Sequence, residues 1–254
     1  MFPTLNAAIC LMGLLMTSWA GETAPPAGSG SCVACHRTVE GVTYLEHNFA
    51  DWEKSIHAKA KVVCEACHIG DSSQKEKAKA HVGMLSSTDS RSPVYFTRIP
   101  TTCGTCHSAE LKAFQRSSHY RELEKSGRGP NCVTCHGSMA NHVLAPRELE
   151  MTCTLCHRRP TQAYATLMAL NNAGLSLKRL EDSLAGARSA KLEVAQQERE
   201  HQKAQGLYRK ALTDWHTFKM RSVLKAAQEV TRACATAANE LQIKGLQQDE
   251  PSRP

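Results

Sequence analysis

The segment Cys132-Val133-Thr134-Cys135-His136 decides the fold, because its Cys-x-x-Cys-His pattern occurs five times between residues 32 and 157. The copies are Cys32-Cys35-His36, Cys64-Cys67-His68, Cys103-Cys106-His107, Cys132-Cys135-His136 and Cys153-Cys156-His157. Together they use ten of the twelve cysteines in the chain. Chance would give roughly 0.03 copies at this Cys and His content. The repeated motif therefore points to one kind of site built five times.

The chemistry of the motif explains its spacing. Two thiols separated by two residues match the two vinyl groups of one porphyrin, to which they add as thioethers, and the adjacent His reaches the iron from the proximal side. Structural zinc sites need no His after each second Cys, and a thioredoxin-like site has a single motif. The sequence therefore predicts five haem c groups held by the ten motif cysteines. The predicted proximal iron ligands are His36, His68, His107, His136 and His157.

An internal repeat surrounds the motifs. Trp52-x-x-Ser55-x-His57 precedes the second motif, and Phe114-x-x-Ser117-x-His119 precedes the fourth. The first and third motifs start 71 residues apart, and the second and fourth start 68 apart. This spacing is typical of a duplicated two-haem module, followed here by a fifth haem.

The repeat also ranks the histidines that could bind iron from the distal side. His57 and His119 occupy matching places in the two modules, and His81 and His142 each follow the second motif of a module. These four are the first candidates for distal ligands.

The fifth distal ligand stays open between two histidines. His47 lies in a stretch of the first module that has no counterpart in the second, and His216 extends an apolar stripe near the C-terminus. We expect His47 to be the ligand and give His216 the lower rank, since a lone His on an apolar stripe is more often a core residue. His201 lies in a polar run and is expected to be solvated.

The C-terminal third has a different texture, since the range 161–241 has no proline and is rich in strong helix formers. Apolar residues recur at alternating steps of three and four, which predicts a helix with one apolar face. One stripe is Leu170, Ala173, Leu177, Leu180, Leu184 and Ala187, and the second is Met220, Val223, Ala227, Val230, Cys234, Ala237 and Leu241.

From these stripes we predict a long helical hairpin over 161–245. Its two antiparallel helices would cover 161–185 and 190–243, with a turn at 186–189, a solvent-exposed polar segment at 193–203 and a disordered tail at 246–254. Two helices bury little surface alone, so the hairpin should pack on the haem domain or on another chain.

The N-terminus resembles a secretory signal. Residues 9–15 are apolar, and Ser18-Trp19-Ala20 resembles a small-x-small cleavage site, although the first twenty residues contain no Lys or Arg. We expect a signal peptide at 1–20 and a flexible leader at 21–31, with a retained membrane anchor as the alternative. The mature protein would be exported, to the periplasm or the extracellular space.

Bulk composition supports a haem-filled interior. Aromatic residues make up only 5% of the chain, which is little for a conventional core. The formal net charge is +7, but no basic run is interleaved with aromatics, which argues against nucleic-acid binding. The fold class predicted is mainly α, with short helices and haem-wrapping loops over 32–160 followed by the hairpin.

The repeated [Trp/Phe]-x-x-Ser-x-His segment before Cys-x-x-Cys-His resembles the hydroxylamine oxidoreductase-like superfamily of multihaem cytochromes, which includes the pentahaem nitrite reductases. The fourth motif followed by Gly137 and His142, and the long helical C-terminus, share this resemblance. It implies closely stacked haem pairs, a periplasmic location, a role in respiratory nitrogen metabolism, dimers through the long helices, and distal roles for His57 and His119. The chain departs from the catalytic members in its short length, in having no Cys-x-x-Cys-Lys motif and in lacking a counterpart of the crosslinking tyrosine.

Three functions are consistent with these patterns. The first is an electron carrier with mostly bis-His haems, whose partners are redox proteins, either quinol-linked or other cytochromes. The second is an enzyme that converts a small nitrogen compound, of the nitrite or hydroxylamine type, at one five-coordinate haem. The third is a subunit of a homo-oligomer or a larger cytochrome complex, assembled through the C-terminal helices. The missing catalytic signatures favour the first.

Overall fold

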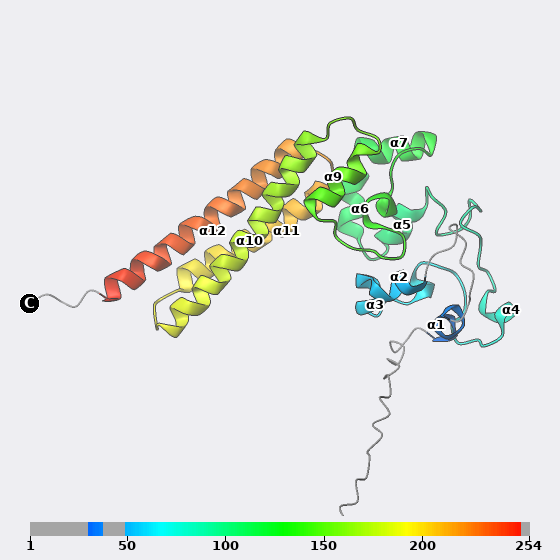
Figure 1. The fold of residues 1–254 in the computed structure, drawn as a ribbon, viewed down its shortest axis with the longest axis horizontal. Coiled ribbons are helices and arrows are strands. Elements are labelled where there is room, and N and C mark those ends of the chain that lie inside the picture. The colour runs from blue at the N-terminus through cyan, green and yellow to red at the C-terminus, as the bar shows by residue number, and fades with distance from the viewer. Residues whose placement is uncertain (1–29, 38–48, 250–254) are drawn as a thin grey trace, which may run out of the picture.

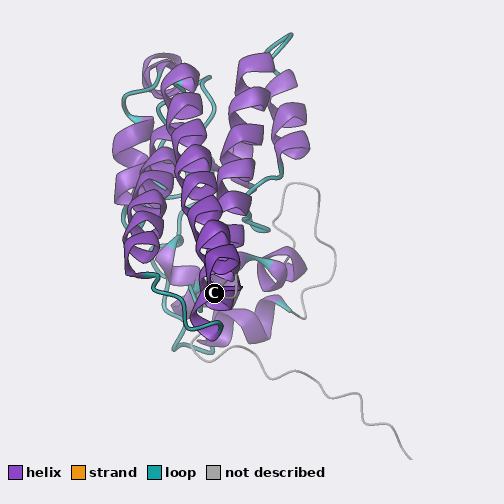
Figure 2. Cartoon of the chain, turned by 90° about the vertical axis from the view of Figure 1, so that its left-hand side faces the viewer, coloured by secondary structure: helices purple, strands orange, loops and turns teal. Residues whose placement is uncertain are grey.

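The structure is a computed structural model that describes residues 30–37 and 49–249. All regular elements of these ranges are helices, which confirms the prediction of a mainly helical fold (Figure 2). The short elements are α1 (Gly30–His36), α2 (Phe49–Lys54), α3 (Ile56–Lys59), η1 (Cys64–Ala66), α4 (Lys77–Ala80), α5 (Ile99–Gly104), α6 (Ser108–Phe114), α7 (Ser118–Ser126), α8 (Cys132–His136) and α9 (Pro146–Thr154). The long helices are α10 (Thr161–Ser189), α11 (Ala195–Trp215) and α12 (Met220–Asp249).

Several predictions for the N-terminal region lie outside the described residues, namely the signal peptide at 1–20 and His47. The leader predicted at 21–31 is described only at its end, where Gly30 and Ser31 already belong to α1. Among the described helices, none is both long enough and apolar enough to cross a membrane.

The C-terminal region is a bundle of three helices, so the predicted two-helix hairpin is wrong. Helix α10 leads away from the motif region, α11 returns toward it, and α12 leads away again (Figure 1). The predicted second helix over 190–243 is interrupted at 190–194 and at 216–219, whereas the predicted turn at 186–189 is still helical. The tail predicted to be disordered from residue 246 continues α12 as far as Asp249.

The first interruption is a helix C-cap that no glycine marks. Lys191 adopts a left-handed backbone with φ of 59°, and its N–H donates to Arg188 O at 2.9 Å. The N–H of Leu192 donates to Ala187 O at 3.0 Å, which completes the pair of bonds of a Schellman motif. The chain therefore reverses before the polar segment at 193–203 can extend α10 into solvent. That segment instead begins α11, and its Gln197 is 2% exposed and donates to Glu240 Oε2 on α12 at 2.8 Å.

The two predicted apolar stripes form the core of the bundle. Every residue of the α10 stripe is buried, and so is every residue of the α12 stripe after Met220. Helix α11 adds the buried Ala204 and Ala211, with Tyr208 and Trp215 packed beside them. The core therefore combines leucines of α10 with small residues of α11 and α12.

This core makes a stability prediction. Leu180 is 1% exposed at the centre of α10, so Leu180→Ala should lower the free energy of unfolding by about 2–5 kcal/mol through lost burial and a residual cavity. Leu175→Ala is the matched control, because Leu175 lies on the same helix but is 46% exposed, and it should cost less than about 1 kcal/mol. Urea unfolding followed by far-UV circular dichroism measures both values. Equal losses in the two variants would contradict the core described here.

The motif-bearing part, by contrast, has little apolar core of its own. Its buried hydrophobic residues are only Val33, Trp52, Ala58, Ala113, Phe114, Leu123 and Leu149, within the described ranges. Its exposed large hydrophobic residues are Ile56, Ile69, Val82, Met84, Phe96, Val143, Met151 and Leu155. A short list of buried apolar residues beside many exposed large ones is what a domain shows when its protein atoms alone do not fill its interior.

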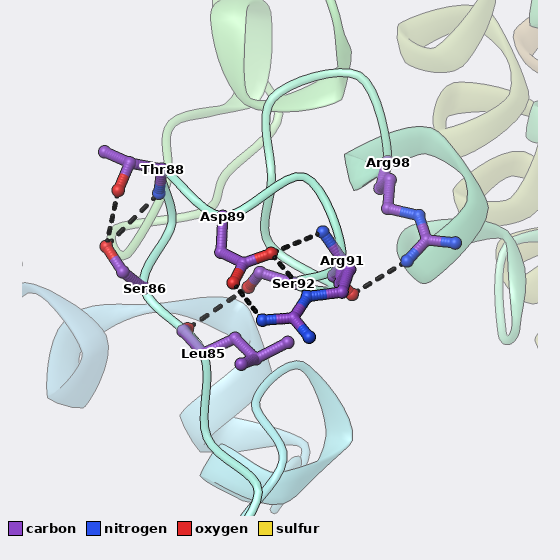
Figure 3. Close-up of polar contacts among 7 residues, drawn as sticks. All are labelled: Leu85, Ser86, Thr88, Asp89, Arg91, Ser92 and Arg98. Atoms are coloured by element: carbon purple, nitrogen blue, oxygen red, sulfur yellow. Dashed lines mark hydrogen bonds and ion pairs between the residues drawn. The ribbon is translucent and has the colours of Figure 1, made fainter.

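An irregular loop joins the two modules and is held by polar contacts rather than by apolar packing (Figure 3). The Asp89 carboxylate accepts hydrogen bonds from the N–H, Nε and Nη2 of Arg91 at 2.9, 3.0 and 2.7 Å. These bonds lower the pKa of Asp89 to about 2. Ser92 Oγ donates to Leu85 O at 3.3 Å, and Arg98 Nη1 donates to Arg91 O at 2.7 Å, which ties the loop to the start of α5.

The bundle docks on the motif-bearing part through α11 and α6. Thr213 Oγ1 donates to Glu110 Oε1 at 3.3 Å, and Arg116 lies 3.7 Å from Asp214. Beside these polar contacts, the rings of Phe114 and Phe218 meet edge to face with centroids 6.4 Å apart. The corner between α11 and α12 is therefore pressed against the second module.

Candidate functional site

Each Cys-x-x-Cys-His motif forms one helical turn. The first and fourth motifs lie within α1 and α8, and the others lie in or directly after η1, α5 and α9. In the second, third and fifth motifs, the N–H of the histidine donates to the carbonyl of the first cysteine, at 2.9 Å for His68, 2.9 Å for His107 and 2.8 Å for His157. A helical turn brings positions i and i+4 to one face, so the first cysteine and the histidine of each motif share a side of the turn.

No disulfide joins the eleven cysteines in the part of the chain that the structure describes. The first cysteine of every motif is half-buried, while Cys35, Cys67, Cys106 and Cys156 are exposed. Within the same residues, no three His, Cys, Asp or Glu side chains converge as a metal site would require. Each motif thus keeps both of its cysteines as thiols.

The five motifs follow one another in space in their sequence order. Burial and the neighbouring Cys32 raise the pKa of Cys64 to about 11, which places the first motif beside the second. Burial and the neighbouring Cys103 and Cys106 raise the pKa of Cys67, which places the second motif beside the third.

The later motifs continue the same chain of contacts. The neighbouring Cys132 lowers the pKa of Cys103, and α5 packs against α8. Burial raises the pKa of Cys135 to about 11, with a further contribution from Cys153, and α8 packs against α9. The motifs thus form one continuous row from the first to the fifth.

Four of the five motif histidines face a second histidine at nearly the same distance. In each pair, one ring belongs to a motif and the other to a histidine outside the motifs. The separations of the ring centroids are 6.1 Å for His36–His81, 6.1 Å for His57–His107, 5.8 Å for His119–His157 and 6.1 Å for His136–His216.

This distance tests whether the residues fit a haem iron. A metal–imidazole bond of about 2 Å, with the ring centre about 1 Å behind the bonding nitrogen, separates the centres of two imidazoles on one iron by about 6 Å. Packed aromatic rings elsewhere in this protein have centroids 5.5 to 6.4 Å apart, so the distance by itself is shared with ordinary ring contacts. What distinguishes the four pairs is that each joins a motif histidine to a histidine outside the motifs, at a spacing that fits bis-His haem.

Hydrogen bonds at Nδ1 orient half of these eight rings. Nδ1 of His57 donates to Asn141 Oδ1 at 2.9 Å, that of His81 to Lys77 O at 2.8 Å and that of His216 to Thr213 O at 3.3 Å. On the motif side, Nδ1 of His136 donates to His142 O at 3.0 Å. A proton held at Nδ1 leaves Nε2 as the metal-binding nitrogen.

The repeat seen in the sequence has a structural cause. Ser55 and Ser117 are N-caps of α3 and α7, and their hydroxyls accept from Ala58 N at 3.1 Å and Tyr120 N at 3.0 Å. The aromatic residues three positions earlier are buried, Trp52 to 8% exposure and Phe114 to 7%. Each unit therefore fixes a short helix whose second residue faces a motif histidine. His57, which lies between the first and second motifs, faces His107 of the third motif. His119, which lies between the third and fourth motifs, faces His157 of the fifth motif.

The structure changes the order of the distal candidates. His216, given the lower rank from sequence, faces His136, whereas His142 is exposed and its Nδ1 donates to Ala140 O at 2.8 Å. The contribution of His142 to the site is its backbone carbonyl. The remaining pairs include His57, His119 and His81 as expected, while His47 lies outside the described residues and His201 lies on α11 in the bundle.

Burial favours the neutral imidazole at two of the distal positions. Desolvation lowers the pKa of His119, and His157 lowers it further. Desolvation also lowers the pKa of His216. Because neutral imidazole is the form that binds a metal, these two side chains hold the required protonation state at neutral pH.

A cavity of about 460 Å³ lies between the second and third motifs. One wall is formed by Cys67 and His68 of the second motif, and the opposite wall by Thr101, Thr102 and Thr105 around the third. It places open space directly beside the attachment residues of the second motif.

Comparison of the chain with known protein families, with curated proteins and with solved structures found no match.

Proposed function

We propose that the protein is a multihaem c-type cytochrome that transfers electrons along a row of five haems. The observation that carries this proposal is the set of four histidine pairs whose ring centres lie 5.8 to 6.1 Å apart, each pair including one Cys-x-x-Cys-His histidine. A haem supplies an iron that changes its oxidation state by one electron.

Each residue then has a role. The ten motif cysteines hold the porphyrins as thioethers, and the motif histidines bind the irons from the proximal side. The distal ligands of the first, third, fourth and fifth motifs are His81, His57, His216 and His119. For His68 of the second motif, His47, which the sequence offered as the fifth distal ligand, remains the candidate.

Occupied iron faces favour electron transfer over catalysis. Two imidazoles on one iron leave no position for a substrate, so these sites exchange electrons without binding a reactant. The contacts between successive cysteines give the path, which runs from the first motif to the fifth in sequence order. Redox partner proteins, quinol-linked or other cytochromes, would meet this path at its ends, in the periplasm or outside the cell.

One experiment separates this proposal from its alternatives. The full chain is produced with a cytochrome c maturation system, and its mass and electron paramagnetic resonance spectrum are measured. We expect the mass of five haems and low-spin ferric signals for at least the four irons with placed histidine pairs. A protein at its bare polypeptide mass would rule out the cytochrome. One high-spin haem in five, with turnover of nitrite or hydroxylamine, would favour the enzyme that acts on a small nitrogen compound.

A further inference from the structure

Two distal histidines with the same local fold have different surroundings at Nδ1. His57 and His119 each occupy the second position of a serine-capped helix, and each faces a motif histidine, at 6.1 and 5.8 Å. Nδ1 of His57 donates to Asn141 Oδ1 at 2.9 Å. Nδ1 of His119 is buried and has no hydrogen-bond partner among the residues that the structure describes.

Phe218 takes the place of an acceptor beside His119. Its ring meets the His119 imidazole edge to face, with centroids 4.2 Å apart and planes at 75°. Phe114 and Trp215 pack around Phe218, with ring centroids 6.4 and 6.0 Å away. The His119 imidazole therefore packs against an aromatic ring and has a buried, unpartnered Nδ1, whereas its duplicate His57 has an amide oxygen as acceptor.

The backbone at Phe218 shows that this position is constrained. Phe218 has φ of 55°, a left-handed conformation that bulky residues rarely adopt and that Gly or Asn would adopt more easily. Such outliers persist where the surrounding structure requires the side chain, and they concentrate at functional sites. The bundle thus holds a strained corner that puts an aromatic ring on His119.

We propose that Phe218 tunes the haem of the fifth motif to a more positive reduction potential than its duplicate at the third motif, by keeping His119 Nδ1 without an acceptor. This inference rests on the proposed haem ligation by His119 and His57. A hydrogen bond at Nδ1 makes an imidazole a more basic ligand, and a more basic ligand stabilises the ferric state. His57 therefore stabilises ferric iron more than His119 does. The change at each iron is one electron, and the Nδ1 proton stays on the imidazole throughout.

The physical consequence is a direction along the row. The third motif lies in the middle of the row and the fifth lies at its end, so a more positive potential at the fifth motif favours an electron at that end over one at the third motif. Phe218 comes from the corner of the helical bundle and Asn141 from the loop after α8. Residues outside the five motifs thus distinguish two sites that the duplication made alike.

The test changes the two Nδ1 environments in opposite senses. Phe218→Asn relieves the backbone and offers a side-chain acceptor, and Phe218→Gly relieves the backbone and admits water, whereas Phe218→Leu keeps apolar cover and serves as the matched control. Asn141→Leu removes the acceptor from His57. Reduction potentials are measured by spectroelectrochemical titration of the five-haem protein, with paramagnetic resonance to check that all variants keep low-spin iron.

We expect one component, about a fifth of the absorbance change, to shift in each case. At fixed ambient potential, the reduced-to-oxidised ratio of the haem at the fifth motif should fall roughly tenfold in Phe218→Asn and Phe218→Gly, which corresponds to about 59 mV for one electron. The same ratio for the haem at the third motif should rise in Asn141→Leu. Phe218→Leu should leave the ratio at the fifth motif in place. Low-spin, five-haem variants with unchanged potentials would overturn the tuning role and leave the cytochrome standing, and a haem-free wild type would overturn the cytochrome itself. If Phe218→Asn loses ligation, Phe218→Gly and Asn141→Leu decide the question.

Discussion

His216→Ala is expected to convert one haem in five from low-spin to high-spin and to let that haem bind carbon monoxide when reduced. His216 is the residue that the structure places opposite His136, with ring centroids 6.1 Å apart and planes inclined by only 25°. Its Nδ1 is 3.3 Å from Thr213 O, which leaves Nε2 available to bind a metal, and burial lowers the pKa of the ring. In the proposed cytochrome, removing this ring would leave the iron of the fourth motif with a single histidine ligand.

His142→Ala is the matched control for this change, because the sequence ranked His142 above His216. The His142 ring is exposed. The His142 carbonyl accepts a hydrogen bond from His136, but this carbonyl belongs to the backbone and remains in His142→Ala. Its spectrum should match that of the wild type. A high-spin signal in His142→Ala with none in His216→Ala would reverse the assignment. Paramagnetic resonance and carbon monoxide difference spectra on the two variants decide it.

The position of His216 explains what the bundle contributes. The corner between α11 and α12 supplies a ring to the fourth motif and, two residues later, Phe218 against the distal histidine of the fifth. Contacts between α11 and α6 hold this corner in place. The helices therefore do more than cover the motif-bearing part, since they complete one of its sites and shape the next.

Local pattern was enough to predict much of this arrangement. The alternating steps of three and four placed the core residues of α10 and α12 correctly, because burial of one face sets that period. The match between the segments ending at His57 and His119 reflects a shared physical unit, a buried aromatic followed by a serine cap. Both features depend on residues close together in the chain.

Features that depend on tertiary contact were missed. The reversal after α10 uses Lys191 in a conformation that usually selects glycine, so no turn residue marked it. Helix α11 buries Ala204 and Ala211, which in a polar run look like neutral surface residues. The pairing of His216 with His136 joins residues 80 positions apart, and it arises only because α11 returns toward the motifs and ends beside them. A spare histidine beside Trp215 and Phe218 was the available signal.

Protein made without haem attachment should lose structure over 32–160 while 161–249 stays folded. Val33, Leu123 and five other buried hydrophobic residues are all that the motif-bearing part has as an apolar core among its described residues, and several large apolar side chains there are exposed. The entropy of ordering a chain of this length far exceeds what such a core returns. The bundle has its own contiguous core and does not need the haems for it.

Limited proteolysis measures this difference between the two parts. Trypsin should digest the haem-free protein to a helical fragment that begins near Thr161, while the five-haem protein resists cleavage across both parts. Far-UV circular dichroism of the fragment should retain the signal of three long helices and unfold cooperatively on heating. The control is Leu180→Ala in the same haem-free background, which should make the fragment sensitive as well, because it weakens the one remaining core. A haem-free protein that resists trypsin over 32–160 would show that the polypeptide fills this interior by itself, and the fit of five haems to the motifs would lose its structural basis.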